Sequence, residues 1–203
     1  MSSADPPAGW PSVPAAGEEA AAVDRELMVR VQAGDEAALG RLMERWERPV
    51  KSVIGRLVGN AAEAEELAQE AFVRLWQQRE RFRAGAEFRP WMLSLALNLA
   101  RNRLRWWRRR PLVTLEEWTP LPPADTADGA GALEARERAE AVRAAVAVLP
   151  LEQREALVLF EYEGLAQAEI AVIAGTTPKA VERRLERARA ALRVSLVRWL
   201  RRD

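Results

Sequence analysis

The sequence predicts an all-α protein with two small helical domains joined by a flexible linker. Apolar residues recur at spacings of three and four through residues 21–110 and 134–203, which is the periodicity of amphipathic helices. The stretch between them, residues 111–133, is rich in proline and lacks this periodicity. Residues 1–20 consist mainly of Ser, Ala, Pro and Gly, so we expect a disordered tail there.

Composition narrows the possible functions. The chain has 203 residues, and its 49% hydrophobic content is enough to build true cores. It contains no cysteine and no histidine, which argues against a disulfide framework, a zinc site and Ser-His-Asp chemistry. There is no Gly-rich phosphate loop, no long apolar run and no signal-like N-terminus. We therefore expect a cytoplasmic protein that is not an enzyme and holds no cofactor or metal.

The first two helices have clear boundary signals. A helix is expected over residues 23–33, where Gly34 ends it and Asp35 can cap the next one. Pro49 should kink this second helix, and Gly59 should end it. Its apolar residues form one continuous stripe, which comprises Leu39, Leu42, Trp46, Val50, Val53 and Leu57.

The stretch 61–110 predicts two further helices with different tasks. Asn60 and Glu63 read as a capping box for the first helix, whose apolar face carries Leu67, Phe72 and Leu75. The second helix is apolar nearly all round over residues 91–100. It then turns basic, with six arginines, no acid and the adjacent pair Trp106 and Trp107 between Asn98 and Arg110. Arginines neutralise phosphates, amides can read base edges and aromatic faces can stack on unpaired bases, so this pattern favours nucleic acid.

The C-terminal domain has helix-turn-helix spacing. Ala171 is small where two helices must cross closely, and Gly175 follows where the turn needs a positive φ. Val181 comes six residues later and can pack back onto the first helix. Thr177 and Pro178 suit the cap and first position of a recognition helix.

These motifs together resemble a known family. The succession AEELAQEAFVRLW, FRPWM and LALNLARN before a basic run is similar to the second conserved region of bacterial sigma factors of the extracytoplasmic-function (ECF) class. LPLEQREALVL, the helix-turn-helix and RLERARAAL resemble the fourth conserved region of the same class. The resemblance implies an alternative sigma factor that binds core RNA polymerase and directs promoter recognition and opening. It divides the chain into a tail (1–20), a region 2-like domain (21–110), an acidic linker (111–133) and a region 4-like domain (134–203).

The same resemblance implies three sets of site residues. Contacts to the minus-ten element are expected from Arg81, Phe82, Arg83, Phe88, Asn98, Arg101, Asn102, Arg105, Arg108 and Arg109. Contacts to the minus-thirty-five element are expected from Thr177, Lys179, Ala180, Arg183, Arg184 and Arg187. The surface for the polymerase clamp is expected to comprise Glu66, Gln69, Glu70, Arg74 and Gln77. The linker would pass near the active-site and RNA-exit channels of the polymerase. Besides core polymerase, the expected partners are promoter DNA and an anti-sigma factor, which in this class is often membrane-anchored.

Two residues depart from the family pattern. Ala166 stands where the family usually has a capping serine, so the helix after it should start less firmly. Glu182 lies early in the recognition helix, where phosphates would repel it although cytosine could donate to it.

Simpler interpretations exist for several of these features. A basic helix end is often only a solvated face, Trp91 fits a core position, and Phe82 and Phe88 can anchor their loop in the core. Two other protein classes also fit in part. One is a sigma mimic that binds an anti-sigma factor without touching DNA, and the other is a simple helix-turn-helix regulator that binds a palindrome as a dimer.

Overall fold

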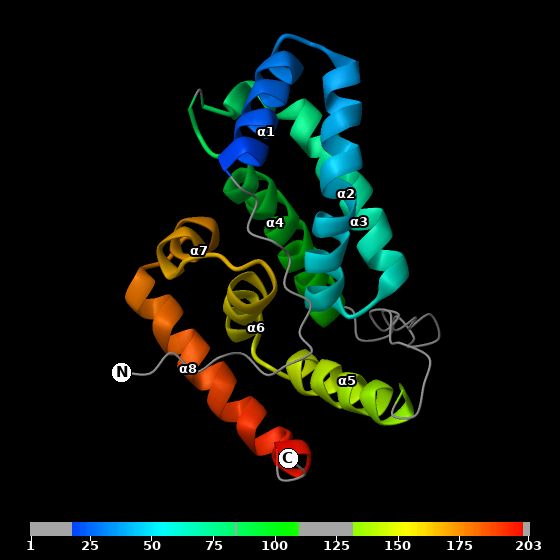
Figure 1. The fold of residues 1–203 in the computed structure, drawn as a ribbon, viewed down its shortest axis with the longest axis vertical. Helices are drawn as coiled ribbons and strands as arrows, with labels where there is room; N and C mark the ends of the chain where they lie inside the picture. Colours follow the sequence, from blue (N-terminus) through cyan, green and yellow to red (C-terminus); the bar gives the residue numbers. More distant parts are fainter. Residues whose placement is uncertain (1–17, 84, 110–131, 201–203) are drawn as a thin grey trace.

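The described residues of the computed structural model, 18–83, 85–109 and 132–200, contain only helices and their connections (Figure 1). The all-α prediction is confirmed. The N-terminal half holds α1 (Glu18–Gln32), α2 (Glu36–Val58), α3 (Ala61–Gln77), the 3-10 turn η1 (Arg79–Arg81) and α4 (Phe88–Arg109). The C-terminal half holds α5 (Ala132–Ala147), α6 (Leu151–Leu157), the π-helix η3 (Val158–Tyr162), α7 (Gln167–Ala174), α8 (Pro178–Ser195) and α9 (Val197–Leu200). Residues 1–17 and 110–131, which include most of the expected tail and linker, lie outside the described residues.

Short-range signals set most helix boundaries as predicted. The Asp35 side chain accepts a hydrogen bond from the Ala38 amide at 3.0 Å and caps α2, while Gly59 ends that helix with φ 78°. Asn60 caps α3 by accepting from the Glu63 amide at 3.0 Å. Helix α2 continues through Pro49 as one element.

Helix α1 begins earlier than predicted. Its first residue is Glu18, inside the stretch expected to be a disordered tail. Two acids in the first turn complement the positive end of the helix dipole, and the alanines at 20–22 have the highest helix propensity. These local effects extend the helix toward the N-terminus.

An aromatic cluster fixes the connector between α3 and α4. The Trp46 and Phe88 rings lie 5.5 Å apart edge to face, and Phe82 stands in the same geometry 5.3 Å from Trp91. The side-chain amide of Gln32 donates to the Phe82 carbonyl at 2.7 Å. The aromatic residues thereby hold the start of α4 against α1 and α2.

The helix-turn-helix forms as predicted between α7 and α8. Ala171 and Val181 are buried at the helix crossing, and Gly175 adopts the left-handed conformation with φ 64°. The Thr177 hydroxyl accepts from the Ala180 amide at 3.2 Å, with Pro178 as the first residue of α8. Val181 therefore faces the core, and the opposite side of α8 is left for solvent.

The two halves of the molecule pack against each other. Helices α6 and α7 lie beside α4 (Figure 1), and one continuous apolar cluster contains α4 residues such as Leu97 together with Leu165 and Ile170. The sequence analysis predicted two domains and their order, but it did not predict this contact.

Candidate nucleic-acid and polymerase surfaces

Helix α4 presents an exposed stripe of amides and arginines, which we call the α4 stripe. It comprises Asn98, Asn102, Arg105 and Arg109, which follow one another at spacings of four, three and four residues on one helix face. The Arg105 guanidinium donates to the Asn102 side-chain oxygen at 2.6 Å. Arg108 is also exposed nearby on the same basic end. The stripe combines cationic groups for phosphates with amides that can bond to base edges.

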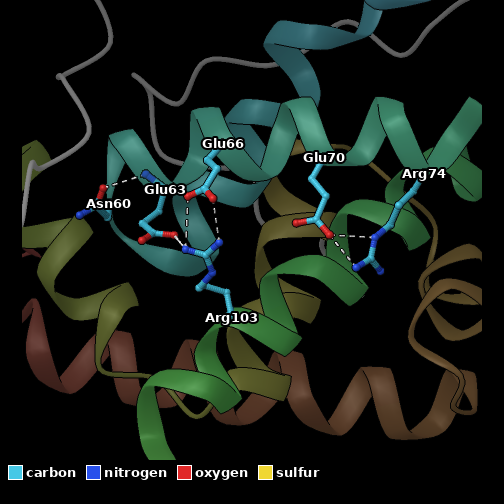
Figure 2. Close-up of polar contacts among 6 residues, drawn as sticks. All are labelled: Asn60, Glu63, Glu66, Glu70, Arg74 and Arg103. Atoms are coloured by element: carbon cyan, nitrogen blue, oxygen red, sulfur yellow. Dashed lines mark hydrogen bonds and ion pairs between the residues drawn. The ribbon is translucent and has the colours of Figure 1, made fainter. Parts of the chain in front are cut away.

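Two other arginines of the same helix are occupied by carboxylates. Two of the three Arg101 guanidinium nitrogens, Nε and Nη2, donate to the two Glu155 oxygens at 2.7 Å, and Glu155 is only 2% exposed at its side chain. This hydrogen bonding raises the pKa of Arg101 above its ordinary value. Arg103 bonds to Glu63 and approaches Glu66 at 3.4 Å, which ties α4 to the start of α3 (Figure 2). The predicted DNA contact Arg101 therefore has a protein partner in this conformation.

The connector divides its predicted residues between surface and core. Arg81 and Arg83 are exposed. Phe82 and Phe88 are 4% and 1% exposed, so neither ring can stack on a base in this conformation. Their burial supports the simpler interpretation, in which they anchor the loop.

Helix α3 carries the residues predicted for polymerase binding. Glu66, Gln69 and Gln77 are exposed, while Glu70 and Arg74 are half-buried and form an ion pair at 2.6 Å (Figure 2). A hollow of about 410 Å³ lies beside them between α3 and α4. Its lining comprises Leu67, Glu70, Arg74, Leu99, Asn102, Arg103 and Trp106. The predicted polymerase surface is therefore adjacent to the α4 stripe.

The recognition helix α8 exposes most of its predicted residues. Thr177, Lys179, Arg183 and Arg187 are exposed, and Ala180 is half-buried. Arg184 is only 21% exposed at its side chain and pairs with Glu152 of α6 at 2.8 Å.

The first turn of α8 contains its own ion pair. The Lys179 ammonium lies 2.6 Å from a Glu182 oxygen, so the acid that departs from the family pattern neutralises the neighbouring lysine. Ala166 offers no side-chain cap to the start of α7. Glu169 compensates for this in part, because its carboxylate accepts a hydrogen bond from the Ala166 amide at 2.8 Å.

Sequence reasoning missed the residues that join the two halves. Glu155 and Glu163 are buried acids, 1% and 2% exposed, whose partners Arg101 and Arg89 lie on α4. One signal was present, because Glu155 sits between apolar residues at helical spacing in α6. A charged residue at such a position requires a buried partner.

The part of the chain that the structure describes lacks both a membrane-spanning helix and a cluster of metal-binding side chains. Within 18–83, 85–109 and 132–200, no helix is both long and apolar enough to cross a membrane. The same residues contain no group of three or more acidic, cysteine or histidine side chains placed to hold a metal ion.

The fold joins a helical bundle that bears an amide and arginine stripe to a helix-turn-helix whose recognition helix is exposed. This combination defines a DNA-binding transcription protein. Family models agree with both halves: the Sigma-70 region 2 model matches residues 42–110 and the Sigma-70 region 4 model matches residues 139–192.

Curated relatives extend the match along the chain. This chain is 34% identical over 191 residues to the RNA polymerase sigma-H factor of Pseudomonas aeruginosa. The match covers 88% of this chain and 96% of that protein. The ECF RNA polymerase sigma-E factor of Escherichia coli is 30% identical to this chain, and the match covers 83% of this chain and 92% of that protein. A probable RNA polymerase sigma factor of Xanthomonas campestris, RfaY, is 36% identical over 81% of this chain, which spans only 42% of that relative.

A solved structure shares the fold. CnrH, in complex with the cytosolic domain of CnrY, superposes with a TM-score of 0.66 at 26% identity and covers 86% of this chain and 97% of CnrH. The chain therefore belongs to the ECF sigma factors of RNA polymerase. Members of this family direct RNA polymerase to promoters and are initiation factors rather than enzymes.

Proposed function

We propose that this sigma factor binds core polymerase through α3 and separates promoter strands through α4. The polymerase surface comprises Glu66, Gln69, Glu70, Arg74 and Gln77. Its support is the exposure of Glu66, Gln69 and Gln77 on a helix whose opposite face is buried. Because the hollow beside this surface also reaches Asn102, a bound polymerase would lie next to the DNA strand.

The α4 stripe carries the proposed strand contacts. Asn98 and Asn102 offer amides to unpaired bases, while Arg105 and Arg109 supply charge for phosphates, with Arg81, Arg83 and Arg108 at the margins. Unstacking one base costs a few kcal/mol, which contacts of this kind can offset. The observation that carries this proposal is the alignment of four exposed polar residues on one face of α4.

The recognition helix carries the proposed duplex contacts. Lys179, Arg183 and Arg187 lie on its solvent side and can reach the minus-thirty-five element in the major groove. Thr177 and Ala180 stand at the N-terminal end of the same helix, where base contacts are usual. Arg184 needs to leave Glu152 before it can contact a phosphate.

Run-off transcription with bacterial core polymerase tests the whole proposal. Discrete transcripts from a fragmented genomic library should appear only when this protein is added. Absence of both transcripts and core binding would contradict it.

A pair of substitutions then separates the two surfaces. Asn98→Ala should reduce promoter opening, measured by permanganate footprinting, more than it reduces core binding, measured by titration. Gln69→Ala should do the reverse. Equal loss of both activities in Asn98→Ala would remove Asn98 from the strand site.

The same proposal includes an anti-sigma partner and a cytoplasmic location. The structurally similar CnrH was solved with the cytosolic domain of another protein, CnrY, which supports a regulatory partner for this chain as well. Copurification of the intact chain from its own cells, followed by mass spectrometry, should recover such a partner in stoichiometric amount.

A further inference from the structure

We propose that Lys179 and Glu182 together read one G·C base pair of the minus-thirty-five element, the ammonium donating to guanine and the carboxylate accepting from cytosine. The inference rests on the proposed duplex contacts of α8 and adds a base preference to them. It gives a function to Glu182, the acid that departs from the family pattern.

Both side chains stand near the start of the recognition helix, where base contacts are usual. Val181 lies between them and is fully buried, so it holds this end of α8 against α7. The Thr177 hydroxyl accepts from the Ala180 amide at 3.2 Å and fixes the helix start. The side chains of Lys179 and Glu182 are 68% and 39% exposed. The fold therefore fixes their backbone and leaves their charged groups accessible to DNA.

The geometry of the ion pair matches the major-groove edge of a G·C base pair. The Lys179 Nζ atom lies 2.6 Å from Oε2 of Glu182. On the base pair, the guanine O6 acceptor and the cytosine N4 donor are joined by a hydrogen bond of about 2.9 Å. A donor and an acceptor on the protein thus meet an acceptor and a donor on the DNA at nearly equal spacing.

The ion pair can stay intact in this contact. An ammonium has three donors, of which one is directed at Glu182, so the others are left for guanine O6 and N7. A carboxylate has lone pairs on both oxygens, so Glu182 can accept from cytosine N4 and from Lys179 together. Because Lys179 neutralises the acid, the repulsion of Glu182 by neighbouring phosphates is reduced. Arg183 and Arg187, which are exposed further along α8, can contact those phosphates.

The same arrangement predicts an order of preference among the four base pairs. A C·G or A·T pair reverses the polarity, so an amino group would face Lys179 and a carbonyl oxygen would face Glu182. A T·A pair keeps the polarity through thymine O4 and adenine N6, but it offers a methyl group where guanine offers N7. We therefore expect G·C to be preferred, T·A to be intermediate, and the two reversed pairs to be disfavoured by about tenfold or more.

The test uses the full chain in complex with core polymerase, on one promoter found by the run-off assay. The base pairs of its minus-thirty-five element are randomised, and each duplex carries a barcode that is copied into the transcript. Sequencing the transcripts measures the base preference at every position. The parent chain should show one position with the order of preference described above.

Two substitutions and a matched control identify the residues that read this base pair. Glu182→Ala and Lys179→Ala should each remove most of the preference of about tenfold at the same position, and the double variant should lose no more. An exposed ion pair adds little to stability, so neither change should unfold the chain. Glu186→Ala is the control, because it removes the same charge from an exposed position one turn further along α8. It should leave the preference unchanged.

The outcomes separate this inference from the proposed function. A preference that is unchanged in Glu182→Ala, or lost equally in Glu186→Ala, would overturn the inference alone. Losses in Glu182→Ala and Lys179→Ala at different positions would do the same, as would a transcribing parent chain without the expected order. Absence of transcripts from the parent chain on any promoter would instead contradict the proposed function, and this inference would fall with it.

Discussion

The two basic helices of this protein, α4 and α8, use their arginines differently. In α4, Arg101 is held by Glu155 of the other half of the molecule. In α8, Arg184 and Arg189 pair with Glu152 and Glu161, which belong to the same half. The paired arginines of α8 thus depend only on the fold of their own half, whereas the pairing of Arg101 depends on the contact between the two halves. Arginine count alone does not measure the charge available to DNA.

The largest expected effect tests whether the two halves fold separately. Phe88→Ala should destabilise the N-terminal half by about 3–5 kcal/mol, because it empties the centre of the aromatic cluster. Because one continuous apolar cluster joins the two halves, calorimetry should show a single transition that moves to lower temperature. Trp106→Ala, at a side chain on the surface, is the control with a small effect. Two transitions, of which only one has moved, would show that the halves unfold separately.

The next prediction compares two arginines of α8. Arg187→Ala should reduce the salt dependence of duplex promoter binding by a slope of about 0.9, because one exposed phosphate contact is lost. Arg184→Ala should reduce it less, because that side chain is already paired with Glu152. Binding of the holoenzyme to promoter duplex, titrated at several salt concentrations, measures both slopes. Equal slopes would show that Arg184 leaves its partner when DNA binds.

The sequence predicted the local features of several helices and missed the long-range contacts. Asp35, Asn60 and Thr177 cap helices through amides three residues away, so the chemistry of each cap is contained in a few neighbouring letters. The spacing of Ala171 and Val181 likewise depends on adjacent helices. The partner of Arg101 lies 54 residues away, and no local pattern specifies it.

The absence of long-range information from local patterns affected the α4 stripe and the connector between α3 and α4 differently. The α4 stripe follows helical spacing, so its alignment could be anticipated from sequence. Phe82 and Phe88 fit both a base-stacking and a core role by residue type, and only their contacts with Trp46 and Trp91 place them in the core. The roles assigned to individual residues remain predictions for the experiments above.

A smaller effect concerns pH and the second buried acid. Burial raises the pKa of Glu163 above its ordinary value of 4.5, and the charges of Arg89 and Arg56 oppose that rise only in part. The packed form therefore keeps a proton on Glu163 at pH values where the separated form has lost it. Glu163 favours packing below this window and loses that contribution as the pH rises from 4.5 through the raised pKa.

Thermal unfolding followed across this pH window gives the corresponding test. The parent chain should lose more stability than Glu163→Gln does as the pH rises, since the glutamine cannot ionise. Identical pH profiles for the two proteins would show that Glu163 does not change its protonation when its burial is lost.

The smallest expected effect lies at the start of α7. Ala166→Ser should stabilise the C-terminal half by at most about 1 kcal/mol, because serine can accept from an amide of the first turn that alanine leaves without a side-chain acceptor. The gain should persist beside Glu169, which accepts from the amide of residue 166 itself and so satisfies a different donor. Thermal unfolding measures the shift. In a Glu169→Ala background, which removes the acceptor, the serine should give the same gain, since the two side chains concern separate amides. A serine effect that vanished there would show that both side chains act on one arrangement of the helix end.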